Sequence, residues 1–121
     1  MSKQEQLLQT LETLRASVPE LRGAMVATTD GLPIAKSFND GVDVNRVAAM
    51  AATALGLGKR ISDTLNIGEM SETSISGSDG QVLIYTVGKK GVLAVVAPSG
   101  TNLGLLNLEA RDAAASITSI L

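Results

Sequence analysis

The chain has 121 residues and a net charge of -2, and it contains no His, Cys or Trp. Without imidazole or thiol groups, it has no ready proton shuttle near neutral pH and no residue for a zinc knuckle, an iron-sulfur site or a disulfide. At this length a single compact domain over residues 1–121 is expected. We therefore expect a protein with no catalytic residues, no metal site and no cofactor.

The distribution of charge and aromatic residues argues against two further classes of partner. The basic residues are scattered, and Phe38 and Tyr85 are the only aromatics, so nucleic-acid binding is not expected. The longest mostly apolar stretch, residues 47–57, is shorter than the roughly 20 residues that span a bilayer. The polar start, without an apolar leader segment, predicts a cytoplasmic protein.

The N-terminal segment has the pattern of an amphipathic helix. Its leucines recur at steps of four and three, which predicts a helix over residues 2–17. Ser2 and Glu5 have the spacing of a capping box, in which each side chain accepts a hydrogen bond from a backbone N–H of the other residue. Pro19 then ends the helix.

Two short β-prone runs follow, over residues 24–29 and 32–38. Asp30 and Gly31 lie between them and tolerate the positive φ angles of a tight hairpin turn. Pro33 has no backbone N–H to donate. The second strand is therefore expected at a sheet edge.

A long second helix is predicted from an Asp43 cap to Leu65, with a left-handed stop over residues 66–68. The helix is dense in alanine and glycine, so another backbone can approach it closely on more than one side. Its broad apolar face consists of Val47, Met50, Ala51, Ala54, Leu57, Gly58, Ile61 and Leu65.

The second half contains three strand candidates and a last helix. In residues 81–87 and 91–97, both the odd-numbered and the even-numbered positions are mainly apolar, so the side chains on both faces of each strand are apolar. This pattern predicts central strands covered on two faces. Residues 70–76 are polar and are expected at an edge. A final helix is expected to open at Thr101 or Asn102 and to run to the end of the chain.

The resulting order is helix, two strands, helix, three strands, helix. Strands that are covered on both faces require helices on both sides of the sheet. The expected fold class is therefore α/β of the α+β type, with three α-β-α layers around a five-stranded, mainly antiparallel sheet.

Four features in this order resemble the roadblock/dynein light chain (roadblock/LC7) family, with its profilin-like architecture. They are the opening helix with the strand at residues 23–29, the hairpin Asp30-Gly31-Leu32-Pro33-Ile34-Ala35, the alanine-rich second helix, and Asn102-Leu103-Gly104-Leu105-Leu106. The first helix makes the chain similar to the bacterial and archaeal members. The resemblance covers essentially the whole chain.

The resemblance implies a non-enzymatic homodimer that binds a small Ras-like GTPase. In the family, the second helices of two protomers pack antiparallel, the third strands pair, and the paired helices form the platform for the partner. The residues expected at the dimer interface are Ala48, Ala52, Leu55, Gly56, Lys59, Ser71, Thr73 and Ile75. Those expected to contact the partner are Arg46, Thr53, Arg60 and Asp63.

Two other patterns have plainer explanations. Residues 56–60 resemble a phosphate-binding loop, but Lys59 is followed by Arg and the segment lies in a predicted helix. Asp30, Asp40 and Asp43 do not have calcium-loop spacing, and turn and cap roles account for them.

Glu69 and Glu72 are the one carboxylate pair that suggests acid/base chemistry, and no second catalytic group is placed beside them. Asn102 has two interpretations, as a ligand contact and as a helix cap, and the cap is favoured.

Two alternative functions stay open. One is a small-molecule-sensing module with a pocket between sheet and helix. The other is a structural subunit of a motor or signalling assembly without nucleotide coupling, which would use the same platform.

Overall fold

The computed structural model describes residues 1–39 and 41–121. The elements occur in the predicted order. They are α1 (Lys3–Ser17), β1 (Gly23–Thr28), β2 (Pro33–Phe38), α2 (Val44–Leu65), β3 (Glu72–Gly77), β4 (Gly80–Val87), β5 (Gly91–Pro98) and α3 (Leu103–Ile120). The strands form one antiparallel sheet in the order β2-β1-β5-β4-β3.

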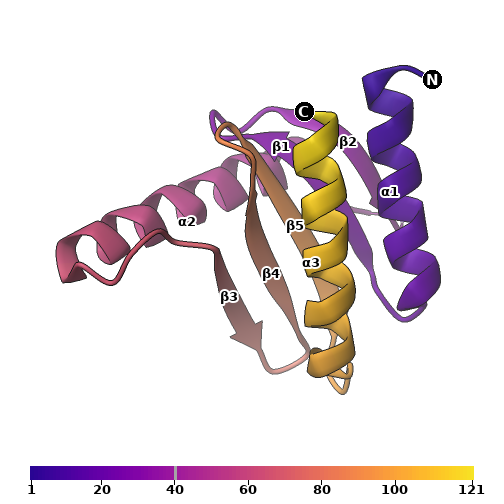
Figure 1. The fold of residues 1–121 in the computed structure, drawn as a ribbon. Coiled ribbons are helices and arrows are strands. Elements are labelled where there is room, and N and C mark those ends of the chain that lie inside the picture. Colours follow the sequence, from indigo (N-terminus) through magenta and orange to yellow (C-terminus); the bar gives the residue numbers. More distant parts are fainter. Residues whose placement is uncertain (40) are drawn as a thin grey trace.

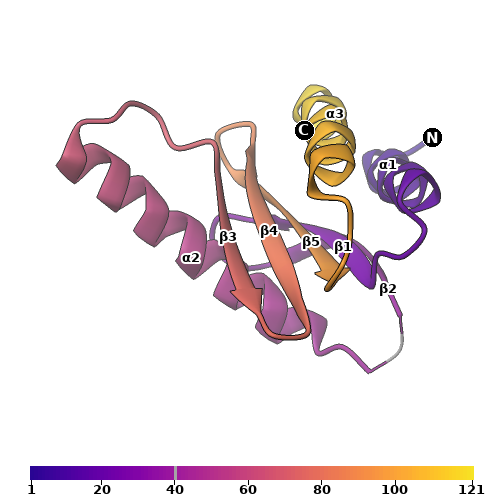
Figure 2. The same cartoon turned by 90° about the horizontal axis from the view of Figure 1, so that it is seen from below.

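The sheet is the middle of three layers. Figure 2 shows α1 and α3 on one face of the sheet and α2 on the other. β5 is the central strand and is buried along nearly its whole length. The expected edge positions of β2 and β3 are both confirmed.

The local signals at the helix ends are also confirmed. Ser2 and Glu5 form the reciprocal capping box of α1. Asp43 caps α2 by accepting from the backbone N–H of Arg46 at 3.2 Å, and Asn66 ends that helix in the left-handed conformation, with φ 55°. The Asn102 side chain accepts from the N–H of Leu105 at 3.1 Å, so it is a helix cap.

Two hydrophobic cores lie on the two faces of the sheet. The larger core packs α1 and α3 against the sheet, with Leu7, Leu11, Leu93 and Leu106 among its fully buried side chains. The smaller core lies under α2. It is built from fewer and smaller side chains than the core under α1 and α3.

The apolar face expected for α2 is correct only in part as a description of what this helix buries within the chain, because Ala51 is buried and Val47 and Ala54 are partly buried, but its larger side chains are exposed. The buried residues of the helix are Ala48, Ala51, Leu55 and Ser62. Figure 1 shows the C-terminal half of α2 projecting beyond β3, the last strand of the sheet. Because no strand of the described chain lies beneath that half, most of the large apolar side chains of the expected face have nothing of their own chain to pack on.

Candidate interaction surface

α2 rests on the sheet along a narrow line of side chains. Ala48, Ala51 and Leu55 are buried and pack in the same core as Met25 of β1 and Ile84 of β4. The two alanines are small, so the helix can lie close to the sheet. Val47 and Ala54 are partly buried against the same core, whereas the side of the helix turned away from the sheet is exposed.

Four large apolar side chains of α2 form a stripe on its surface, which we call the apolar stripe. Their spacings of seven and four residues place them on one side of the helix. Between 49% and 63% of each is exposed. The members of the apolar stripe are Met50, Leu57, Ile61 and Leu65. A contiguous exposed apolar patch of this kind is typical of a protein-binding surface.

The opposite flank of α2 faces the hairpin turns at one end of the sheet. A Cβ atom on Gly31, in the β1–β2 turn, would lie 3.1 Å from the Cα of Ala49. Lys59 and Asp63 line a cavity with Lys89 of the β4–β5 turn. The apolar stripe therefore faces the other end of the sheet, where β3 ends.

β3 contributes the second part of the surface. Its pairing places Thr73 opposite Ile84 and Ile75 opposite Val82, which puts both side chains on the face that carries α2. Ile75 is 57% exposed because α2 does not cover it. Along its outer side β3 pairs with no described strand, so its backbone groups are free to bind another strand.

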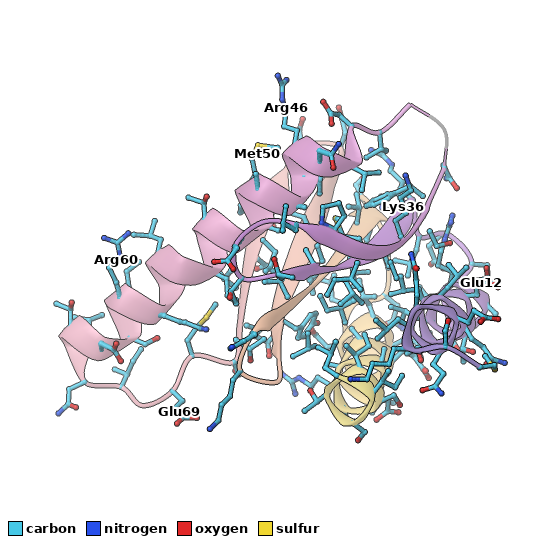
Figure 3. All side chains as sticks on the ribbon, turned by 90° about the horizontal axis from the view of Figure 1, so that it is seen from above. Glu12, Lys36, Arg46, Met50, Arg60 and Glu69 are labelled. Carbon is cyan, nitrogen blue, oxygen red and sulfur yellow. The ribbon has the colours of Figure 1, made fainter. Side chains whose placement is uncertain are left out.

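A third group of residues lies on the side of α2 turned away from the sheet, and we call it the outer row. Figure 3 shows Arg46 and Arg60 projecting from this side of the helix, with Met50 of the adjoining apolar stripe next to Arg46. Thr53, whose hydroxyl donates to the carbonyl of Ala49 at 2.9 Å, lies between the two arginines along the helix. The outer row consists of Arg46, Ala49, Thr53, Gly56 and Arg60.

The structure separates the residues expected at the dimer interface into three groups. The first group lies at the edge strand: Ser71 just before β3, and Thr73 and Ile75 within it. These alternate residues lie on the face of the sheet that carries α2. Ala48 and Leu55 are buried in the core of their own chain, so a second copy cannot reach them. Ala52 and Lys59 lie on the flank of α2 away from the apolar stripe, and Gly56 lies between that flank and the outward side, as a member of the outer row, judged from 3.6 residues per turn.

The residues expected to contact the partner are all exposed. Arg46, Thr53 and Arg60 fall together on the outer row, whereas Asp63 lies toward the hairpin turns. The apolar stripe was not among the residues expected at an interface. Its members all belong to the apolar face expected for α2 from the periodicity of the sequence. Periodicity cannot distinguish a side chain that packs on its own sheet from one that packs on another molecule.

A polar cluster joins β3 to α3 on the opposite face of the sheet. The hydroxyl of Tyr85 donates to Oδ1 of Asn107 at 2.6 Å, and Nη2 of Arg111 lies 2.6 Å from Oε1 of Glu72. Burial raises the pKa of Tyr85 to about 12, with a smaller contribution from the carboxylate of Glu72. The cluster fixes the start of β3 against α3.

The two glutamates of the acid/base hypothesis are not brought together. Glu72 pairs with Arg111 on the α3 face, while Glu69 lines the cavity near Lys59 on the α2 face. The segment that resembles a phosphate-binding loop lies inside α2, where its backbone groups are engaged in the helix. Asp40, which belonged to the calcium hypothesis, lies outside the described residues. Within residues 1–39 and 41–121 no three acidic side chains group as metal ligands.

One open cavity of about 600 Å³ bears on the small-molecule hypothesis. It lies along the edge of β2 and is walled by α1 and by the segment leading into α2, with Leu8, Ile34 and Val42 among its lining residues. The expected position for a ligand was between sheet and helix, and this cavity lies between the edge strand β2 and helix α1, open to solvent. As for the bilayer, no helix in the described part of the chain combines the length and apolar character needed to span it.

Comparison with known proteins identifies the family. Residues 7–97 match the model of the Roadblock/LC7 domain. Three uncharacterized proteins of Methanocaldococcus jannaschii are each 34% identical over 100 residues, which is 83% of this chain and 84–87% of theirs.

Solved structures show the same fold at low identity. The gliding protein MglB from Thermus thermophilus superposes with a TM-score of 0.90 at 16% identity, covering 99% of this chain and 91% of that one. A Roadblock/LC7 domain from Streptomyces avermitilis gives 0.86 at 20% identity, covering 93% and 94%. The chain therefore belongs to the Roadblock/LC7 domain family.

Proposed function

We propose that the chain is a non-enzymatic homodimeric scaffold or regulator in the cytoplasm, and that the paired α2 helices bind a small Ras-like GTPase. The apolar stripe of α2, beside the free edge of β3, is the observation that carries the proposal. Both features lie on the same side of the molecule. Each lacks a partner among the described residues of its own chain.

A second copy related by a twofold axis would satisfy both features. Pairing β3 with β3 in antiparallel fashion joins two five-stranded sheets and provides partners for the free backbone groups. The projecting half of α2 then lies over the partner's sheet, and the two apolar stripes face each other. A twofold interface of this kind is self-complementary, as homodimers require.

The energetic gain is consistent with a stable dimer. Complete burial of one large aliphatic side chain contributes about 1.5–3 kcal/mol. The four members of the apolar stripe and Ile75 are each about half exposed, so each copy retains a substantial part of this contribution for association. A solved structure of MglB with a tetrameric arrangement supports self-association in proteins of this fold.

The dimer part of the proposal is tested by sedimentation of paired variants. Leu57→Glu places a charge in the apolar stripe and is expected to give a monomer. Leu108→Glu is the matched control, because Leu108 is 59% exposed on α3 and Leu57 is 54% exposed on α2. A monomeric unaltered protein, or a dimer that survives Leu57→Glu, would refute this interface.

The partner part is tested by calorimetry against the small GTPases encoded in the same genome, each loaded with GDP or with a GTP analogue. The chain offers no evident catalytic group, so the proposed role is to hold the switch loops of the GTPase. Binding in at least one nucleotide state is expected. If no GTPase binds in either state while the protein remains dimeric, the GTPase role is wrong and a purely structural subunit becomes the better description.

A further inference from the structure

The outer row of α2 contains two residues that are unfavourable choices for a helix considered by itself. Arg46 is the third residue of α2, where the positive end of the helix dipole disfavours a cation. Gly56 lies in the middle of the helix, where glycine is less stable than alanine. Residues that break local rules without a gain in their own fold are expected at functional sites.

Packing within the chain does not explain Gly56. A Cβ atom built on Gly56 meets no atom within 4 Å outside its own stretch of helix. Gly58 differs, because a Cβ atom there would lie 2.8 Å from Cε of Met70, so its missing side chain makes room for that methionine. The space above Gly56 is thus free for an external group.

The charge of α2 is opposite to that of the rest of the protein. The helix carries Arg46, Lys59 and Arg60 against Asp63 alone, a net charge of +2 in a chain whose total is -2. Within the described residues, the one ion pair is that between Arg111 and Glu72, so the guanidinium groups of Arg46 and Arg60 are not engaged there. Figure 3 shows both projecting away from the sheet.

The spacing of the two arginines sets the size of the surface. They are fourteen residues apart, which corresponds to about 21 Å along the helix. Between them lie the small side chains of Ala49 and Thr53 and the open position of Gly56. The outer row is therefore a surface of small side chains with an arginine near each end. Arginine is among the residues that most often anchor protein interfaces.

We propose that the outer row recognises a protruding, acidic element of the partner protein, which approaches α2 closely at Gly56 and pairs its carboxylates with Arg46 and Arg60. This inference rests on the proposed function, since it specifies the chemistry of the surface that the partner presents. In the dimer, two outer rows lie side by side. The same recognition then operates with four arginines.

Three variants test the inference. Gly56→Ala is expected to raise the unfolding temperature by about 3 to 6 °C, and Arg46→Glu by about 1 to 4 °C, because each removes an unfavourable choice for the helix. Both variants, and Gly56→Leu, are expected to weaken binding of the GTPase at least tenfold while sedimentation still shows a dimer. Lys36→Glu, on the exposed edge strand β2, is the charge-matched control and is expected to bind normally.

A measurement that does not depend on the partner uses a short poly-L-glutamate peptide and the backbone amide signals of the unaltered protein. In NMR spectra, the largest changes in amide chemical shift on addition of the peptide are expected at Arg46, Thr53, Gly56 and Arg60. These changes should disappear in high salt. Shifts centred on the turn lysines Lys89 and Lys90, or spread evenly over the cations, would overturn the inference.

The outcomes also separate this inference from the proposed function. If a GTPase binds the Arg46→Glu and Gly56→Leu variants as tightly as the unaltered protein, the acidic-element inference is wrong and the GTPase role stands. If no GTPase binds the unaltered protein, the GTPase role is wrong. The peptide measurement then decides whether the outer row recognises acidic surfaces.

Discussion

Tyr85 is a buried tyrosine whose hydroxyl has a raised pKa. Burial against α3 raises the pKa of its hydroxyl to about 12, Glu72 adds to the rise, and Arg111 partly opposes it. Since the ordinary value is 10.0, the neutral hydroxyl is favoured in the folded state. The resulting stabilisation is complete below pH 10 and is lost as the pH rises from 10 to about 12.

The absorbance of tyrosinate measures this directly, because Tyr85 is the only tyrosine and the chain has no tryptophan. The unaltered protein is expected to titrate near pH 12. Glu72→Gln should lower the midpoint, since it removes the negative charge, and Arg111→Gln should raise it. A midpoint near 10 in a protein that is still folded would contradict the buried position of the hydroxyl.

At the scale of single elements, α2 differs from α1 and α3 in how its apolar surface is divided. Ala48, Ala51 and Leu55 hold it on the sheet, while the apolar stripe remains exposed. A side-chain cap satisfies a backbone N–H that the first turn of a helix leaves without an intrahelical acceptor. The Asp43 cap is therefore expected to matter for the whole interaction surface, because α2 carries both the apolar stripe and the outer row.

Replacement of this cap tests that dependence. Asp43→Ala leaves the backbone N–H of Arg46 without its acceptor and is expected to lower the free energy of unfolding by about 1 kcal/mol. Asp43→Asn keeps a side-chain oxygen and is the matched control, expected to stay within a few tenths of a kcal/mol. Denaturant unfolding of the three proteins gives the comparison, and equal midpoints would show that the cap is dispensable.

At the scale of the whole molecule, folding and association are expected to be coupled. The smaller core under α2 is completed by the second copy in the proposed dimer, so dimerisation adds to the stability of the fold. The unfolding temperature should then rise with protein concentration. The same temperature should become independent of concentration in Leu57→Glu and remain dependent on it in Leu108→Glu, which calorimetric scans over a range of concentrations would show.

Local signals in the sequence were sufficient for the order of elements and for their ends. Ser2 with Glu5, Asp43 and Asn102 each bond backbone groups within a few residues, and such bonds depend on little beyond neighbouring positions. The edge position of β2 also followed from a local property, the missing N–H of Pro33. The family resemblance agreed with this interpretation because the same signals occur in the same order.

The sequence by itself thus determined the fold class, the caps and the sheet edges, while the tertiary structure alone decided which side of α2 is free. Met50 and Leu57 were expected on one face together with Ala51, yet only Ala51 is buried. The physical reason is that helical spacing fixes which side chains share a face but not how the helix lies on the sheet. That is set by the close approach of Ala48 and Ala51 and by the limited width of five strands, beyond which α2 projects.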